Sequence, residues 1–167
     1  MNITELSTKT DIDVRSLRYV IEYEILPPME GLMPGRGLPR EFDPYIGFLV
    51  ALAAYMRGMG LRRGLVKQVM ETVLEYRKPG FEPGSIIVPV IYTAFGFAKR
   101  SELQIGDASN VRIVSDPPHL KTGKRTVQTM SMPWTQMETQ EKIADGYEPS
   151  GTISVRIDLL AGRVGYK

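Results

Sequence analysis

Apolar residues recur with helical spacing along the first half of the chain. One apolar face is formed by the residues at i, i+3, i+6 and i+7: Val14, Leu17, Val20 and Ile21. This spacing predicts a helix over residues 14–24 with one face turned toward a core. Asp13 should be its N-cap, because a carboxylate can accept hydrogen bonds from the free amides of a first turn. The helix should end before Pro27, since proline disfavours helical geometry in the residue before it.

Three more helices are predicted in the same half. A short one spans residues 2–9, with Thr4 as its expected cap. Asp43 followed by Pro44 is a strong helix start, and that helix should end near Gly58 or Gly60. Residues 62–77 carry another apolar stripe. We expect the last two helices to form an antiparallel hairpin that closes the core over the first two.

The pattern changes after residue 77. Proline and glycine recur over residues 78–84, which predicts a linker. Short β-like runs follow at residues 85–97, 110–115, 125–131 and 152–159. The last of these alternates cleanly between apolar and polar residues, and Ala161-Gly162 is expected to turn it back on itself. The predicted fold class is therefore α+β, with a helical domain over residues 1–77 and a small β-rich domain over residues 85–167.

Composition excludes several kinds of site. The chain has no cysteine and one histidine, which rules out disulfides and thiolate metal ligands and argues against a metal sensor. No stretch is long and apolar enough for a membrane span, and acidic residues interrupt the N-terminal segment where a signal peptide would need an apolar core. We therefore expect a cytoplasmic protein with no membrane partner and no metal or other cofactor.

The exposed side of the predicted helix 14–24 carries the candidate DNA contacts. Four residues lie off its apolar face: Arg15, Ser16, Arg18 and Tyr19. A helix packed on one side and offering arginines on the other suits a DNA major groove, although the same pattern also fits a solvated helix face. Further basic residues lie in a Gly/Pro-rich run over residues 29–41 and at the start of the fourth helix: Arg36, Arg40, Arg62 and Arg63. The net charge is only +2, so DNA binding has to rest on where these cations lie.

The order of these elements resembles the DNA-binding domain of the MerR family of transcription regulators over roughly residues 1–76. The matching residues are Val14, Arg15, Ser16, Leu17, Arg18, Tyr19, Leu26, Pro27, Pro28, Arg40, Phe42, Gly60 and Leu61. The resemblance implies a winged helix-turn-helix in which residues 14–24 dock in the major groove and residues 29–41 form a wing on the DNA backbone. The chain departs from the family pattern at Asp11, Val20 and Glu24, and it lacks the long dimerising helix that usually follows.

Candidate chemistry in the second half is sparse. A methionine-rich run with the lone tryptophan could line an apolar ligand pocket or could plug a core: Met130, Met132, Trp134 and Met137. His119 has Asp116 and Ser115 nearby in sequence, but adjacency does not make a catalytic triad, and no nucleophile or metal motif accompanies it. We therefore expect a protein that is not an enzyme.

The sequence-based hypothesis is a sequence-specific, nucleoid-associated transcription regulator. Its expected partners are double-stranded DNA, a second copy of the chain through the C-terminal domain, RNA polymerase and a small apolar effector. Two alternatives stay open: an excisionase-like or architectural DNA-binding accessory protein, and a winged-helix module that binds protein instead of DNA.

Overall fold

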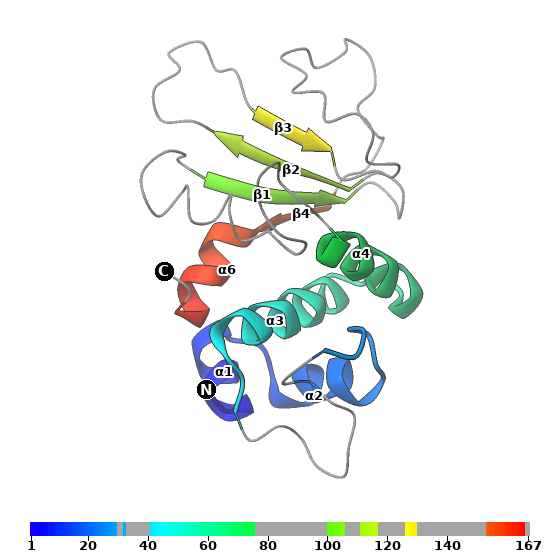
Figure 1. Ribbon diagram of the computed structural model, residues 1–167. Helices are drawn as coiled ribbons and strands as arrows, with labels where there is room; N and C mark the ends of the chain where they lie inside the picture. The colour runs from blue at the N-terminus through cyan, green and yellow to red at the C-terminus, as the bar shows by residue number, and fades with distance from the viewer. Residues whose placement is uncertain are drawn as a thin grey trace. The chain divides into compact units, whose positions relative to one another are not determined.

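The fold was described from a computed structural model of the whole chain. The structure describes residues 1–29, 32, 41–75, 100–105, 111–116, 126–129 and 153–165. Its elements in chain order are α1 (Ile3–Thr10), α2 (Val14–Glu22), α3 (Pro44–Gly58), α4 (Arg63–Glu75), β1 (Arg100–Ile105), β2 (Val111–Asp116), β3 (Thr126–Thr129), β4 (Ile153–Arg156) and α6 (Ile157–Val164) (Figure 1). The fold is α+β, as the sequence predicts.

The chain forms two compact units. The first, which we call the helical unit, contains residues 1–71 and 159–167, and the second, the sheet unit, contains residues 72–158. The sequence-based boundaries assign the last nine residues to the C-terminal domain, whereas this division gives them to the helical unit. The helical unit is therefore made from both ends of the chain.

The first helix begins with a capping box. The Asn2 side chain accepts a hydrogen bond of 2.9 Å from the Glu5 main-chain N–H, and the Glu5 carboxylate accepts one of 3.1 Å from the Asn2 N–H. The expectation that Thr4 caps this helix is wrong, because Asn2 and Glu5 already satisfy its first amides. The helix ends at Asp11, whose φ of 61° is left-handed, a conformation that aspartate tolerates.

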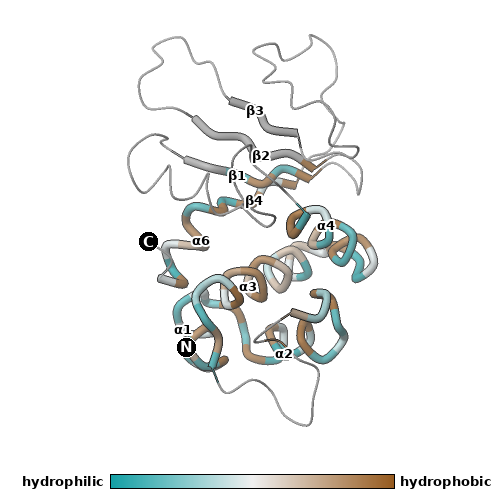
Figure 2. The backbone as a smooth tube through the Cα atoms, viewed as in Figure 1, coloured by the Kyte–Doolittle hydropathy of each residue, from teal (hydrophilic) through white to brown (hydrophobic). Residues whose placement is uncertain are grey.

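The third helix is the core of the helical unit. The Asp43 carboxylate accepts a hydrogen bond of 2.9 Å from the Ile46 N–H, and Pro44 occupies the first turn, as predicted. Residues from Ile46 to Ala54 are all buried, and the tube of α3 is mostly brown in Figure 2. A helix that is apolar on every side must be surrounded by other elements. Both α1 and α2 pack against it.

The C-terminal helix corrects one sequence-based prediction. The predicted strand over residues 152–159 extends only over β4, and α6 begins at Ile157. Ala161 and Gly162, expected to form a turn, lie within α6. Arg163 donates a hydrogen bond of 3.3 Å to the carbonyl of Thr10 at the end of α1. A Cβ added to Gly47 of α3 would lie 3.3 Å from the side chain of Val164, so α6 packs closely on the helical unit.

The described strands form an antiparallel sheet in the order β3-β2-β1-β4. The predicted runs at residues 110–115 and 125–131 correspond to β2 and β3, whereas β1 was not predicted, and the run at residues 85–97 lies outside the described residues. Leu103, Ile105 and Val155 are buried. The Glu102 carboxylate is also buried and accepts a hydrogen bond of 2.9 Å from the Ser154 hydroxyl, which ties β1 to β4.

Candidate nucleic-acid interface

The second helix has one fully buried face and one exposed face. Leu17 and Val20 have no exposed surface, because they pack toward α3. Arg15 and Arg18 are exposed on the other side, where the sequence predicts them. Because the buried leucine and valine fix the helix on its core, both arginines extend from a firmly held backbone.

The N-terminal end of α2 is held by Asp13. Its carboxylate accepts hydrogen bonds from the Ser16 hydroxyl at 2.6 Å and from the Ser16 N–H at 2.8 Å. These bonds hold the pKa of Asp13 below its ordinary value, the Ser16 hydroxyl making the largest contribution. Ser16, predicted to contact DNA, therefore donates its hydroxyl proton to the Asp13 carboxylate. Only the lone pairs of its hydroxyl oxygen are left for DNA.

The C-terminal end of α2 is a Schellman motif. The Ile25 N–H donates to the Val20 carbonyl at 3.1 Å and the Glu24 N–H donates to the Ile21 carbonyl at 3.3 Å. Glu24 has a φ of 48°, so it occupies the left-handed position that glycine usually takes in this motif. Glu24 therefore bears a backbone strain that a glycine at this place would not bear.

A stack of two tyrosines and two arginines lies beside the exposed arginines of α2. The rings of Tyr19 and Tyr23 are 4.3 Å apart between centroids. The guanidinium carbon of Arg57 lies 5.4 Å from the Tyr19 centroid, and that of Arg63 lies 5.9 Å from the Tyr23 centroid. Both distances are within the range of cation–π attraction. We call these four residues the tyrosine–arginine ladder.

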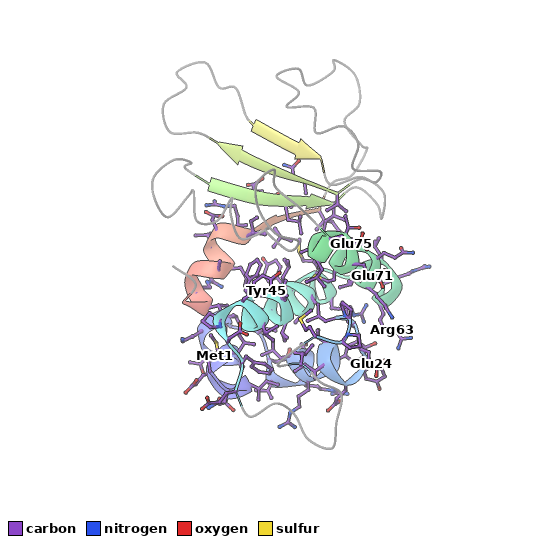
Figure 3. All side chains as sticks on the ribbon, in the orientation of Figure 1. Met1, Glu24, Tyr45, Arg63, Glu71 and Glu75 are labelled. Atoms are coloured by element: carbon purple, nitrogen blue, oxygen red, sulfur yellow. The ribbon has the colours of Figure 1, made fainter. Side chains whose placement is uncertain are left out.

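The ladder joins α2 to the junction between α3 and α4. Arg57 is in the last turn of α3, and Arg63 is the first residue of α4. Arg63 is exposed and projects from the start of its helix (Figure 3). Arg57 is half-buried, and its Nη1 donates a hydrogen bond to the carbonyl of Leu61. Sequence reasoning missed Tyr23 and Arg57, although the four-residue spacing of Tyr19 and Tyr23 on one helix was a signal for the pair.

The start of α4 is strongly basic. Arg62 and Arg63 are exposed, and the first turn of α4 contains no acidic residue. The free amides of a helix N-terminus carry partial positive charge, so two arginines there repel the helix dipole. An anion such as a phosphate would satisfy both the arginines and the amides.

Two carboxylates temper the positive charge of this surface. Glu22 and Glu24 are exposed, and Glu22 lies one helical turn after Arg18. A glutamate four residues from an arginine on a helix can pair with it in solvent. Glu22 and Glu24 therefore lower the positive potential beside Arg18 without removing its charge.

Several predicted site residues lie outside the described residues. These are Arg36 and Arg40 of the proposed wing and the methionine-rich run Met130, Met132, Trp134 and Met137. Within the described ranges, no group of histidine and acidic side chains could hold a metal ion. None of the helices in those ranges has the length and apolar character needed to cross a membrane.

Comparison of this chain with protein-family models, with curated proteins and with solved structures gives no match.

Proposed function

We propose that this protein is a sequence-specific DNA-binding regulator that places α2 in the major groove of double-stranded DNA. The observation that carries the proposal is the contrast between the two faces of α2. Leu17 and Val20 are fully buried, whereas Arg15 and Arg18 are exposed. A guanidinium group can pair with O6 and N7 of guanine through two hydrogen bonds, and each such pair is worth about 1–3 kcal/mol of discrimination between bases.

The other cations of the surface suit the sugar-phosphate backbone. Arg62 and Arg63 stand at the N-terminus of α4, where amides and guanidinium groups can share one phosphate. Tyr19 adds a hydroxyl group that can donate to phosphate, whereas the Ser16 oxygen can only accept and is proposed to face a base edge in the groove. In the same proposal residues 29–41 form a wing, and Arg36 and Arg40 contact the backbone from it. Phosphate contacts of this kind set the register of a protein on DNA without reading its sequence.

The proposal extends to partners. Two half-sites require two recognition helices, so we propose a homodimer, with residues 85–167 as the β-rich domain that provides the contact. RNA polymerase and a small apolar effector that binds near Trp134 are further proposed partners, and the nucleoid is the proposed location.

Selection from a library of random duplexes tests the DNA-binding proposal. We expect the wild-type chain to enrich one sequence motif, and we expect Arg18→Ala to reduce affinity for the enriched duplex by at least about tenfold. Lys9→Ala is the matched control, because Lys9 is an exposed cation on α1 and is expected to have little effect. Equal enrichment of all sequences would favour an architectural accessory protein.

The exposed acidic residues favour one alternative function. Glu22 and Glu24 would repel phosphate if they faced a duplex, and Tyr23 is 53% exposed beside them. A surface with an exposed tyrosine and both signs of charge also suits a protein partner. Failure of the wild-type chain to retain any duplex at low salt would favour this protein-interaction module over the regulator.

A further inference from the structure

We propose that Arg57 is a positioning residue for the proposed DNA contact: Leu17 and Val20 seat α2 on its core, and Arg57 restrains the remaining small rotation of the helix by holding Tyr19. The inference rests on the proposed function of α2. It assigns a specificity-determining role to a side chain that does not itself reach the duplex.

The contacts of Arg57 connect three parts of the helical unit. Its guanidinium lies over the Tyr19 ring of α2, with 5.4 Å between the guanidinium carbon and the centroid. Its Nη1 donates to the Leu61 carbonyl in the segment between α3 and α4. Its Nε is buried and has no hydrogen-bond partner among the described residues. The guanidinium is therefore held between a main-chain carbonyl and an aromatic face, with its Nε shielded from solvent.

The position of Tyr19 determines where the two groove-facing arginines point. Tyr19 follows Arg15 by one helical turn and Arg18 by one residue, so all three share one rigid segment of α2. A helix with its side chains has a radius of about 5–6 Å, so a rotation of about 10° moves the side-chain ends by roughly 1 Å. Hydrogen-bond distances vary by only about 0.5 Å, so such a rotation would break a bidentate contact with guanine.

Arg63 provides the internal comparison. It makes the same kind of contact with Tyr23, at 5.9 Å, but it is exposed and stands at the N-terminus of α4. Arg63 is therefore free to bind phosphate, whereas Arg57 is committed to Tyr19 and Leu61. The two arginines of the ladder should affect DNA binding in different ways.

The experiment compares Arg57→Lys with Arg63→Lys and Arg63→Ala. Lysine keeps the positive charge but lacks the planar group that stacks on a ring while donating to a carbonyl. The probes are the duplex enriched by the wild-type chain from a random library and a scrambled duplex of the same composition, each titrated at several salt concentrations. Urea unfolding of each variant shows whether it is folded.

We expect Arg57→Lys to lose about tenfold or more in affinity for the enriched duplex, with little change for the scrambled duplex and an unchanged dependence on salt. Arg63→Ala should weaken binding to both duplexes and reduce the slope of log K against log salt by about one, because a phosphate contact is lost. Arg63→Lys should restore most of that loss. Tyr19→Leu should lower the ratio of the two affinities as Arg57→Lys does, beside an equal loss for both duplexes from its missing hydroxyl, and the double variant should lower the ratio no further than either single one.

Two results would overturn the inference while leaving the proposed function intact. One is an Arg57→Lys variant that keeps the wild-type ratio of affinities for the two duplexes. The other is an Arg57→Ala variant that weakens both duplexes equally and lowers the salt slope while Arg57→Lys binds like the wild type, because that would make Arg57 a phosphate contact. If Arg57→Lys does not fold, the ratio of affinities for the two duplexes is measured with Tyr19→Leu, and a wild-type ratio in that variant would overturn the inference. A wild-type chain that enriches no duplex would overturn the function and the inference together.

Discussion

Glu24 shows how a single residue can be strained next to a proposed interface. It takes the left-handed position after α2 with a φ of 48°, whereas Gly60 takes the corresponding position after α3 with a φ of 91°. A residue with a Cβ loses roughly 1–2 kcal/mol in this conformation. The Schellman hydrogen bonds to Val20 and Ile21 and the burial of Ile25 hold Glu24 there despite this cost.

We therefore predict that Glu24→Gly raises the free energy of unfolding by about 0.5–1 kcal/mol, since relief of the strain is partly offset by the freedom of glycine in the unfolded chain. The same change removes a negative charge beside the arginines and should raise affinity for duplex DNA. Urea unfolding measures the first effect. Glu22→Gln is the control that removes a neighbouring charge without changing the backbone, and a Glu24→Gly variant no more stable than this control would contradict the prediction.

Arg62 precedes the first residue of α4, at a position where Ser, Thr, Asp or Asn usually caps a helix. We predict that Arg62→Ser stabilises the free protein by about 0.5–1 kcal/mol, because the hydroxyl can accept a hydrogen bond from the first turn and one cation leaves the positive end of the helix. The same variant should bind every duplex more weakly. If Arg62→Ser lowers both the free energy of unfolding and the affinity for DNA, Arg62 stabilises the fold and the prediction is wrong.

Asp13 makes part of the stability depend on pH. Its pKa is lowered in the folded protein by the hydrogen bonds from Ser16, so the ionised carboxylate stabilises the fold above the unfolded pKa of about 4. This contribution should disappear as the pH falls through the lower folded pKa. Asn at this position keeps an acceptor for capping but has no carboxylate to protonate. We predict that the free energy of unfolding of Asp13→Asn changes less with pH in the acidic range than that of the wild type. If the free energy of unfolding of Asp13→Asn falls with pH as steeply as that of the wild type, this pH dependence comes from other carboxylates.

Among the elements, α6 has the clearest consequence for how the chain can be divided. From Leu159 onward it belongs to the helical unit, where Arg163 bonds to Thr10 and Val164 lies against Gly47. A fragment limited to residues 1–77, the domain that the sequence predicts, would lack these contacts. The helical unit should therefore need both ends of the chain to reach its full stability.

Two adjacent leucines of α6 test this packing with a matched control. Leu160 is 5% exposed and Leu159 is 53% exposed. We predict that Leu160→Ala lowers the free energy of unfolding by about 2–4 kcal/mol, because it leaves a cavity where the leucine side chain is now buried. Leu159→Ala should change it by no more than about 0.5 kcal/mol. Equal effects in urea unfolding would show that α6 does not pack on the helical unit in solution.

The sequence predicted those helices in which a capping residue and an apolar stripe indicate the same element. Asp13 and the Asp43-Pro44 pair mark helix starts, and the apolar stripes that follow them are the buried stripes of α2 and α3. The segment from residue 153 to 164 was assigned wrongly because the alternation of Ile153, Val155, Ile157 and Leu159 fits a strand as well as a strand followed by a helix. The helix forms where α6 can bury Ile157 and Leu160, which only the tertiary structure reveals.

The candidate interface was predictable only in part, for a similar reason. Arg15 and Arg18 follow from the period of one helix, and their exposure confirms that part. The role of Arg57 depends on a contact with a ring 38 residues earlier, between separate helices. No periodicity within one element encodes such a contact. β1 was missed because its sequence RSELQI has only two apolar residues, so the turn signal Gly106-Asp107 that follows it had no β-like run before it.

At the scale of the whole molecule, function depends on how charge is distributed. The net charge is only +2, yet arginines gather on one side of α2 and at the start of α4. Non-specific affinity for DNA should consequently be modest and should fall steeply with salt. The two compact units also divide the proposed work, with DNA contact in the helical unit and subunit contact in the sheet unit of residues 72–158. Specificity would then come from a few well-held arginines, with little help from a broadly basic surface.

Competition between matched duplexes tests the central claim most directly. The duplex enriched by the wild-type chain is compared with duplexes in which each guanine pair is replaced in turn, using wild type and Arg18→Ala. We expect at least one guanine replacement to cost the wild type about five- to a hundredfold in affinity and to cost Arg18→Ala almost nothing, because the contact is already lost. Equal losses for both proteins at every position would contradict the claim that the exposed face of α2 reads the sequence of DNA.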